Sequence, residues 1–519
     1  MCIYIDFYRQ FLYNDEDLFF NKNFCIIRIR NADFNYNFNG VGVCRMTARE
    51  KIECLFDSGT FVETDAYVVS RAAELNAEKI PGDGVVAGYG TMDGRLVYAA
   101  AQESSFMGGA LGEMQAKKIA DTVERAARMG APYIGLLDCS GARIQEGLDA
   151  LAGFGQIITA MSSASGVIPM VSAVMGPCPA GMSFVAQLAD FIFMTEKAAM
   201  SVNGAEALKA AGNLEADEKT VGGVEMNTEK NGCVHFTADT DEACLAKLKE
   251  LVALLPDNNL SGAPAELCND DLNRTSGELA SLTKKEAYNV KDVIRAVTDN
   301  GYFLEVHEKF AGNIVIGFGK MNGSVIGIVA NQNAVQEGAL SVKACIKASR
   351  FVQFCDSFNI PILTLTDTAG FVPCICEEKQ GLARALSKLV YTFSQATVAK
   401  VNVIINKAYG SAYVAMNSKS LGADFTYAWE GSDIAPMEPI ACASVLYHDE
   451  IAASDDQAAC RKEKAKEYRA QYGTPLHAAS RGYVDDVIEP SSTRARVISA
   501  FEMLATKRVS GPARKHGNK

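Results

Sequence analysis

The stretch that decides the fold is Gly88-Tyr-Gly-Thr-Met-Asp-Gly94, because it recurs in the second half of the chain as Gly317-Phe-Gly-Lys-Met-Asn-Gly323. Runs rich in valine, isoleucine and leucine flank both copies, and each copy ends in Asp-Gly or Asn-Gly. Such a dipeptide between two apolar runs is typical of the turn of a β-hairpin. The sequence therefore predicts the same hairpin in two places.

The same spacing continues beyond the hairpins. Three pairs of residues keep the offset that separates Gly88 from Gly317: Pro132 with Pro361, Asp138 with Asp367, and Gly141 with Gly370. The pattern before each proline predicts a helix, over 113–129 and 342–358, and the apolar run after it predicts a buried strand, over 133–137 and 362–366. Repetition at this scale indicates duplicated domains rather than a solenoid.

A second strand follows in each half, over 169–175 and 400–405, and leads to a turn of small residues. These turns are Ala180-Gly181 and Gly410-Ser411, and their offset is one position longer than that of the hairpins. The order hairpin, helix, strand, helix, strand, turn and helix predicts an α/β fold with right-handed crossovers and helices covering the sheets. A chain of 519 residues also exceeds one ordinary core and fits two domains of about 200–250 residues.

We divide the chain into four segments. Residues 1–45 form an atypical N-terminal extension, in which acidic residues interrupt the apolar run that a secretory signal needs, and Met46 is an alternative start. The N-terminal domain covers 46–260 and the C-terminal domain covers 286–519. The linker between them, 261–285, overlaps a stretch rich in Asp, Asn, Pro, Ser and Gly.

Composition excludes several classes of protein. The net charge of −12 argues against nucleic acid as a partner, because an acidic surface repels phosphate. The 15 cysteines form no CxxC pair, and Cys374 and Cys376 are the closest two. Their scatter argues against a zinc ribbon and favours a reduced, cytoplasmic protein. No apolar stretch approaches the ~20 residues that span a bilayer.

Both halves place glycine-bearing turns where strands end. These turns are Asp138-Cys-Ser-Gly-Ala142 and Met175-Gly-Pro-Cys-Pro-Ala-Gly181 in the first half, and Asp367-Thr-Ala-Gly-Phe371 and Lys407-Ala-Tyr-Gly-Ser-Ala412 in the second. Ligands of α/β sheets gather at such ends, and the N–H groups that open a helix attract negative charge. Two N–H donors that face one oxygen form an oxyanion hole. The alternative is that these turns only connect strands to helices.

Other candidate sites find less support. The five histidines lack metal-binding spacing, and neither a GxSxG elbow nor a P-loop occurs, which argues against a hydrolase triad and a nucleotide site. Asp138 and Asp367 could act as general bases or cap the turns that follow them. Arg143 and Arg384 could meet a phosphate or carboxylate, or form ion pairs.

A series of motifs runs in one order from Met46 to the C-terminus. It includes Thr47-Ala-Arg-Glu50, Pro81-Gly-Asp-Gly-Val-Val86, Gly108-Gly-Ala-Leu-Gly-Glu113, Gly141-Ala-Arg-Ile-Gln-Glu-Gly147, Ser165-Gly-Val-Ile-Pro169, Gly327-Ile-Val-Ala-Asn-Gln332 and Arg481-Gly-Tyr-Val-Asp485. In these motifs the chain resembles the carboxyltransferase subunits of biotin-dependent acyl-CoA enzymes, namely the β subunits of propionyl- and acetyl-CoA carboxylases and the α subunits of methylmalonyl-CoA decarboxylases.

The resemblance implies an α/β fold of two tandem crotonase-like β-β-α domains, of the ClpP/crotonase superfold. It also implies a homohexamer with active sites between the first half of one subunit and the second half of another. The implied reaction moves CO2 between carboxybiotin and the α-carbon of a short acyl-CoA, either propionyl-/methylmalonyl-CoA or acetyl-/malonyl-CoA, without a metal. Its direction, carboxylation or decarboxylation, stays open.

The resemblance also implies roles for particular residues. The acyl-CoA thioester oxygen would meet Ala180 and Gly181, and the ureido oxygen of biotin would meet Ser411 and Ala412. Further substrate-binding residues would be Gly108, Gly109, Gly141, Ala142, Arg143, Gly370, Phe371, Tyr413 and Val414. The family has glycine where this chain has Ala180, Ser411 and Cys374, and it has Asp-Ser-Gly-Gly where this chain has Asp138-Cys-Ser-Gly141.

Biotin must arrive on another polypeptide, because this chain has no lysine between two methionines. The implied partners are a biotin carboxyl carrier protein and either a biotin carboxylase or a membrane decarboxylase subunit, which could bring a cytoplasmic protein to the membrane. Two other functions stay open. One is a biotin-independent crotonase-type hydratase or isomerase with Glu146 as its base, and the other is a non-catalytic scaffold.

Overall fold

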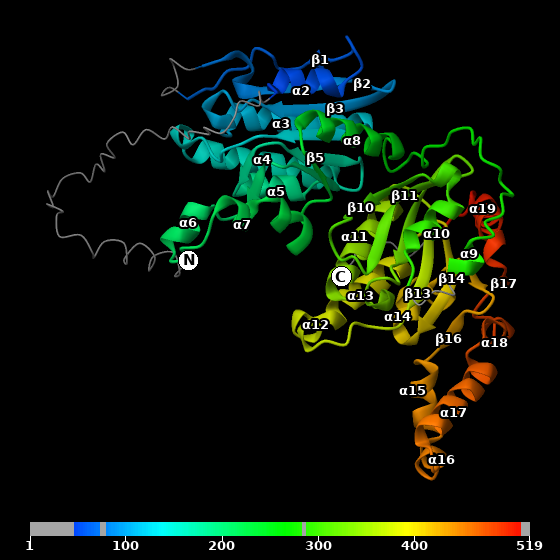
Figure 1. Ribbon diagram of the computed structural model, residues 1–519. Coiled ribbons are helices and arrows are strands. Elements are labelled where there is room, and N and C mark those ends of the chain that lie inside the picture. Colours follow the sequence, from blue (N-terminus) through cyan, green and yellow to red (C-terminus); the bar gives the residue numbers. More distant parts are fainter. Residues whose placement is uncertain (1–45, 73–78, 283–286, 510–519) are drawn as a thin grey trace. The chain divides into compact units, whose positions relative to one another are not determined.

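A computed structural model describes residues 46–72, 79–282 and 287–509 of the chain. The predictions for the extension 1–45 lie outside the described residues. Within the described part, two large sheets organise the chain, one in each half (Figure 1).

The first sheet combines an antiparallel hairpin with a parallel part. In spatial order its strands are β1 (Val62–Glu63), β2 (Val85–Met92), β3 (Arg95–Gln102), β4 (Tyr133–Leu137), β5 (Met170–Val174), β7 (Phe191–Thr195) and β9 (Phe236–Ala238). Strands β1, β2 and β3 pair antiparallel, and every later pair in the order is parallel. Two short parallel strands, β6 (Pro177–Pro179) and β8 (Ala199–Ser201), lie off this sheet.

The second sheet repeats this arrangement. Its strands in spatial order are β10 (Phe303–Val306), β11 (Ile314–Met321), β12 (Ser324–Asn331), β13 (Ile362–Thr368), β14 (Lys400–Tyr409), β15 (Phe425–Trp429) and β17 (Asp486–Ile488). The last residues of β14 also pair with β16 (Asp433–Ala435), just as β6 pairs with β8 in the first half. The two halves therefore share one topology.

The predicted hairpins are present in the same register. Tyr89 pairs with Tyr98 between β2 and β3, and Phe318 pairs with Gly327 between β11 and β12. At the first turn both Asp93 (φ 49°) and Gly94 (φ 76°) have positive φ, and the second turn repeats this pattern. Such angles are typical of type I′ turns, which explains the Asp-Gly and Asn-Gly pairs.

Helices cover the sheets. They are α2 (Ala48–Leu55), α3 (Glu113–Met129), α4 (Leu148–Ala164), α5 (Gly181–Gln187), α6 (Ala205–Ala210), α7 (Glu218–Gly222), α8 (Asp241–Leu254), α9 (Leu279–Leu282), α10 (Val290–Val297), α11 (Val342–Ser357), α12 (Ile375–Gln380), α13 (Leu382–Gln395), α14 (Gly410–Ala415), α15 (Pro439–Leu446), α16 (His448–Ala452), α17 (Gln457–Tyr472), α18 (Pro475–Ser480) and α19 (Thr493–Leu504). The helix predicted over 113–129 is α3, and α11 ends one residue before the predicted end.

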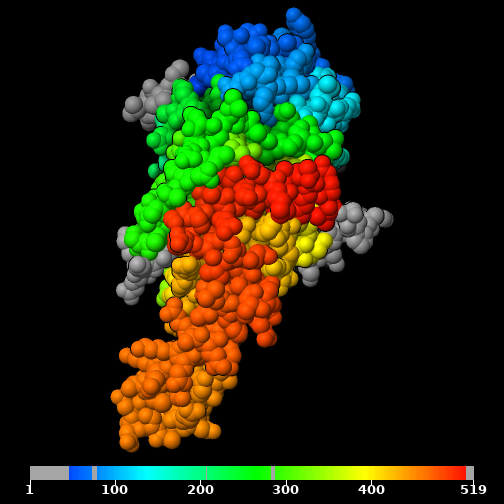
Figure 2. Space-filling view, turned by 90° about the vertical axis from the view of Figure 1, so that its right-hand side faces the viewer, coloured from blue at the N-terminus to red at the C-terminus, as the bar shows by residue number. Residues whose placement is uncertain are grey.

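Corresponding helices pack in corresponding ways. Helix α4 packs on α3, and α13 packs on α11. Aromatic rings join the halves, since Phe191 of β7 lies with its ring centroid 4.7 Å from that of Phe354 in α11. Helices α15, α16 and α17, coloured orange in Figure 2, form an arm that stands away from the rest of the second half. None of the described helices has the length and apolar character to cross a bilayer.

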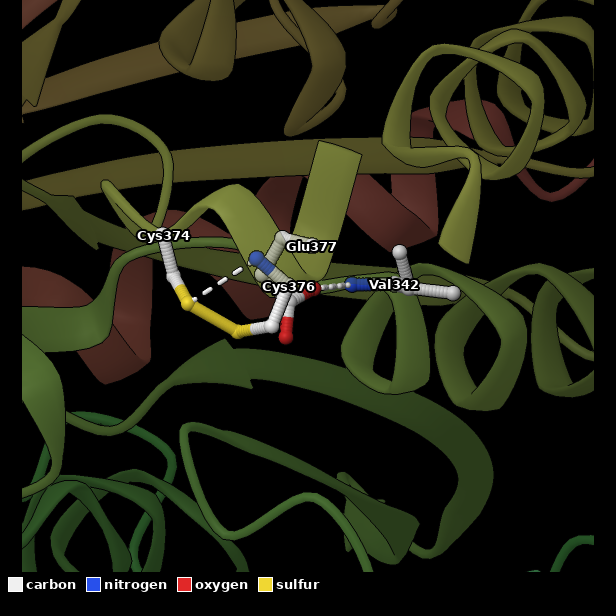
Figure 3. Close-up of a disulfide and its surroundings, with 4 residues drawn as sticks. All are labelled: Val342, Cys374, Cys376 and Glu377. Atoms are coloured by element: carbon white, nitrogen blue, oxygen red, sulfur yellow. Dashed lines mark hydrogen bonds between the residues drawn. A yellow bond between two sulfur atoms is a disulfide. The ribbon is translucent and has the colours of Figure 1, made fainter. Parts of the chain in front are cut away.

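One expectation about the cysteines is wrong. Cys374 and Cys376 form a disulfide, whereas the scattered pattern predicted reduced cysteines throughout (Figure 3). The chain turns into α12 at this point and brings their Cα atoms to 5.2 Å, which is within the range that a disulfide can bridge. The other cysteines in the described ranges are free.

Candidate functional site

The first-half turn connects β6 to the start of α5. Ala180 lies there at φ 48° and ψ −124°, a region that glycine adopts readily and other residues adopt under strain. Its N–H donates to the Ser201 carbonyl oxygen of β8 at 3.0 Å. The Ala180 amide is therefore already engaged, which argues against it as a donor to a ligand. Gly181 is half-buried and opens α5, where N–H groups have no partner inside the helix.

The second-half turn has the same construction. Gly410 has φ 64° and follows β14, as Ala180 follows β6. Ser411 is exposed at the start of α14, whereas Ala412 is buried. When Ala180 is aligned with Gly410, Gly181 corresponds to Ser411 and the buried Met182 corresponds to Ala412. Gly181 and Ser411 are thus the accessible, equivalent positions of the two halves.

A close-packed glycine supports the neighbouring loop in each half, and in the first half it is one of a pair, Gly108 and Gly109. A Cβ atom at Gly109 would lie 2.0 Å from the Asp138 carbonyl oxygen, so only glycine fits there. Gly108 has positive φ, and its carbonyl oxygen accepts the Ser140 N–H at 3.1 Å. In the second half Gly338 lies against the Asp367 carbonyl oxygen, where a Cβ atom would come within 2.1 Å.

Backbone hydrogen bonds hold Gly141, Ala142 and Arg143 beside Leu111. The Leu111 N–H donates to Gly141 O at 2.8 Å, and Leu111 O accepts the Arg143 N–H at 2.9 Å. Because these two bonds use the neighbours of Ala142, the N–H of Ala142 itself faces away from Leu111. A Cβ atom at Gly141 would lie 3.9 Å from Pro179 Cγ, so this loop adjoins the Ala180 turn.

The second half repeats this bridge. The Leu340 N–H donates to Gly370 O at 3.0 Å, and Leu340 O accepts the Val372 N–H at 3.0 Å. Phe371 therefore occupies the place of Ala142, and both residues are half-buried. The structure brings the predicted residues of each half to one edge of its sheet.

Arg143 itself does not face a ligand. Its buried guanidinium donates to Asp83 at 2.9 Å and to Glu146 at 2.7 Å. Burial raises the pKa of Asp83 in spite of this partner. Burial on its own would also raise the pKa of Glu146, but hydrogen bonds from Glu113, Arg143 and Ser70 outweigh burial and lower it.

Glu146 is consequently a structural residue. Its carboxylate accepts hydrogen bonds from Ser70 Oγ at 2.8 Å and from the Glu113 N–H at 2.6 Å, in addition to Arg143. A carboxylate with a lowered pKa and three donors is a poor general base. The hydratase or isomerase alternative thereby loses the base it requires.

The two aspartates that follow the buried runs of β4 and β13 link elements of the fold. Asp367 is buried and accepts hydrogen bonds from Tyr288 Oη at 2.5 Å and from the Lys407 N–H at 3.0 Å, so it joins β13 to β14 rather than capping the next turn. Burial raises its pKa. Asp138 is also buried and lies 3.6 Å from the buried ammonium of Lys51. Neither carboxylate is accessible enough to act as a base.

Two predicted residues of α14 face different ways. Tyr413 packs against the small cluster that contains Ile404 and Ala408, and burial raises its pKa to about 12. Val414 is 38% exposed and therefore lies on the same open side of the helix as Ser411. Only Val414 of this pair is placed to meet a ligand that approaches α14 from outside.

The described residues line several cavities, and two of them involve the first half. One of about 630 Å³ adjoins α5 and is lined by Phe184, Leu188 and Val202 among others. The second, of about 480 Å³, is lined by residues of both halves that include His235 and His307, away from the two turns. Within the described ranges, no group of His, Cys, Asp and Glu side chains has an arrangement suited to a metal.

Comparison with known proteins extends these observations. Residues 43–519 match the family described as carboxyl transferase domain. The chain is 44% identical over 480 residues to methylmalonyl-CoA decarboxylase subunit alpha of Propionigenium modestum, covering 91% of this chain and 93% of that protein. It is equally similar, over the same shares, to the carboxyltransferase subunit of propionyl-CoA carboxylase from Haloferax mediterranei.

A solved structure matches the whole arrangement. It is the transcarboxylase 12S hexamer assembly with hydrolysed methylmalonyl-coenzyme A bound, at 42% identity and a TM-score of 0.89, covering 91% of this chain and 92% of that one. This match confirms the predicted fold class of two tandem crotonase-like domains. The family resemblance stated from the motifs is confirmed as well.

Proposed function

Because this chain belongs to the carboxyltransferase family, we propose that it moves CO2 between carboxybiotin and the α-carbon of a short acyl-CoA. The candidate acyl groups are propionyl/methylmalonyl and acetyl/malonyl. The observation that carries the proposal is the pair of equivalent turns, which presents Gly181 in the first half and Ser411 in the second. The reaction has two partners, each of which develops negative charge on an oxygen.

Main-chain N–H groups supply the chemistry at both turns. Removing one donor from an oxyanion hole typically costs about 10²–10³ in kcat. We assign Gly181 and Ala142 to the thioester oxygen of the acyl-CoA, and Ser411 and Phe371 to the ureido oxygen of biotin. Ala180 is left out because its N–H is engaged, and Ala412 because it is buried.

Biotin fits the second-half turn on chemical grounds. When bound there, its ureido group carries and releases the carboxyl group. Ser411 is an exposed residue whose N–H can donate to the ureido oxygen, and Val414 gives the ring an apolar neighbour. No side-chain nucleophile or metal is required, so the buried Asp367 only fixes the ends of β13 and β14.

A second copy of the chain completes each site in this proposal. Exposed apolar side chains occur on the elements next to the first-half turn, with Ile144 at 89% and Leu148 at 79% exposure after the Gly141 loop and Phe184 at 47% in α5. Exposed apolar surface of this kind marks an interaction site. The solved relative is a hexamer, and we propose the same state for this chain.

Further partners follow from the proposed chemistry. Biotin would be carried by a biotin carboxyl carrier protein, and the carboxyl group would be supplied or removed with a biotin carboxylase or a membrane decarboxylase subunit. We place the chain in the cytoplasm, since the free cysteines of the described residues suit a reducing compartment. The direction of the reaction depends on the partner, because both directions pass through the same enolate.

The test is biotin-dependent decarboxylation by the purified chain. With free biotin and methylmalonyl-CoA or malonyl-CoA, we expect CO2 release that saturates with biotin concentration. Release that proceeds equally without biotin would favour an enzyme that acts on acyl-CoA alone. No release with any of these esters, from a chain that is folded and oligomeric, would favour a scaffold.

A further inference from the structure

The disulfide joins Cys374, at the end of the loop that follows Gly370 and Phe371, to Cys376 in the first turn of α12. Figure 3 shows the two cysteines and the bond between their sulfur atoms. Cys374 is the N-cap of α12, and its Sγ accepts the Cys376 N–H at 3.1 Å. Glu377, one residue further on, accepts the Val342 N–H at 2.6 Å. The disulfide thus adjoins the contact that ties α12 to the start of α11.

The first half has the same contact without a disulfide. There the Glu113 N–H, at the start of α3, donates to Glu146 at 2.6 Å, in the place of Val342 and Glu377. The buried guanidinium of Arg143 holds Glu146 in position. The second half has Val372 at the position equivalent to Arg143, so it lacks this ion pair. The disulfide is the covalent constraint found on the equivalent loop.

The disulfide between Cys374 and Cys376 is accessible to a reductant from solvent. Cys376 is exposed, Ile375 beside it is 76% exposed, and Cys374 is half-buried. A disulfide that closes such a short loop restricts the unfolded chain less than one that closes a long loop. Exposed disulfides are the ones that exchange readily, and disulfides in reducing compartments are usually transient or redox-sensing.

We propose that Cys374 and Cys376 form a thiol–disulfide exchange site for dithiol reductants, and that its redox state controls biotin binding at the second-half turn. A thiolate of the dithiol attacks Cys376 Sγ and releases Cys374 as a thiolate. The second thiol of the reductant then displaces Cys376. The reductant becomes a disulfide, and its two electrons and two protons end on the two protein thiols.

Reduction removes the covalent bond between Cys374 and Cys376, and with it the constraint on the segment that runs from Gly370 to Glu377. The loop then samples more conformations, so Phe371 and its N–H are less often in position for the ureido oxygen. We expect the KM for free biotin to rise several-fold on reduction, with the KM for acyl-CoA unchanged. This second part rests on the proposed function, whereas the exchange reaction itself does not.

Mass spectrometry of alkylated thiols tests the exchange site without any activity measurement. The native full-length protein is alkylated before and after treatment with dithiothreitol, and the peptide that contains Cys374 and Cys376 is compared. We expect this peptide to take up two alkyl groups only after reduction, while exposed Cys54 is labelled in both samples. Equal labelling of Cys374 and Cys376 in both samples would overturn the proposal.

Kinetics test the consequence for biotin. The double variant Cys374→Ser/Cys376→Ser should show the raised KM for biotin in both redox conditions, whereas Cys54→Ser should respond to dithiothreitol like the wild type. An unchanged KM for biotin in the double variant would overturn control of biotin binding. Should the chain lack decarboxylation altogether, the proposed function fails, and the labelling result still decides the exchange site.

Discussion

Cys139 and Thr368 occupy equivalent positions in the two halves, and each side chain closes the same ring around a glycine. Cys139 Sγ accepts the Gly141 N–H at 3.4 Å and donates to Gly141 O at 3.3 Å. Thr368 Oγ1 makes both contacts with Gly370 at 3.2 Å. The thiol of Cys139 therefore performs the structural role that a hydroxyl performs in the other half.

This relationship predicts how Cys139 tolerates substitution. Cys139→Ser should keep both contacts and leave the free energy of unfolding within about 1 kcal/mol of wild type. Cys139→Ala should lose about 1–3 kcal/mol, because the Gly141 N–H is left without its partner. Urea denaturation measures both values. Equal stabilities of the two variants would contradict the role of the side chain.

Replacing Ala180 by glycine should stabilise the folded protein. A non-glycine residue in a sparsely populated backbone region costs about 1–3 kcal/mol, and the added flexibility of glycine in the unfolded chain offsets part of this gain. We expect Ala180→Gly to raise the free energy of unfolding by about 1 kcal/mol. The control is Ala186→Gly in the last turn of α5, where glycine should destabilise the helix. A loss of stability in Ala180→Gly would show that the turn is not strained.

The Arg143 ion pair should be essential to the fold. Arg143→Ala leaves Asp83 and Glu146 buried without their cation, which typically costs about 3–5 kcal/mol. The matched control is Arg128→Ala on α3, whose partner Glu124 is exposed, with an expected loss below about 1 kcal/mol. Denaturant midpoints compare the two variants. Similar small losses in both would mean that the buried pair contributes little.

Lys347 should make stability depend on pH. Burial lowers its pKa to about 7, while the unfolded side chain titrates near its usual value of about 10.4. Between these values the unfolded chain binds more protons, so stability should rise with pH, by at most about 1.4 kcal/mol per unit.

Comparing two lysine variants measures how much Lys347 contributes to the pH dependence of stability. Lys347→Met should flatten the rise in stability between pH 7 and pH 9, whereas Lys343→Met, at an exposed position of the same helix, should leave it unchanged. Thermal unfolding at several pH values provides the measurement. An unchanged slope in Lys347→Met would show that this ammonium stays protonated in the folded chain.

Local patterns predicted much of the fold. The pattern of residues before Pro132 located α3 at 113–129, because that signal lies within the helix itself. The prediction for β14 stopped at 405, whereas the strand runs to Tyr409. Its last residues pair with β16, and a partner strand that the chain reaches only after β15 leaves no mark on the local sequence.

The site was predicted less completely, for physical reasons that differ from residue to residue. Arg143 was expected to meet substrate, but its partner Asp83 lies 60 residues away and only the folded chain brings them together. The sequence predicted the donor pairs Ala180 with Gly181 and Ser411 with Ala412. These two pairs do not occupy equivalent positions in the two halves, because the second pair lies one residue too far along the chain. The offset that aligns Ala180 with Gly410 pairs Ser411 with Gly181 instead. Nothing in the sequence predicted the disulfide except the short spacing between Cys374 and Cys376.

The most direct test of the central claim uses the main-chain N–H of Ser411. Ser411 is the second residue of α14, in the first turn, where a main-chain N–H has no partner inside the helix, so proline there removes this donor without breaking a helical hydrogen bond. Ser411→Ala keeps the N–H and removes only the hydroxyl. In biotin-dependent decarboxylation, Ser411→Pro should lower kcat by about 10²–10³, with Ser411→Ala close to wild type. Equal activity of a folded Ser411→Pro variant and Ser411→Ala would contradict the account.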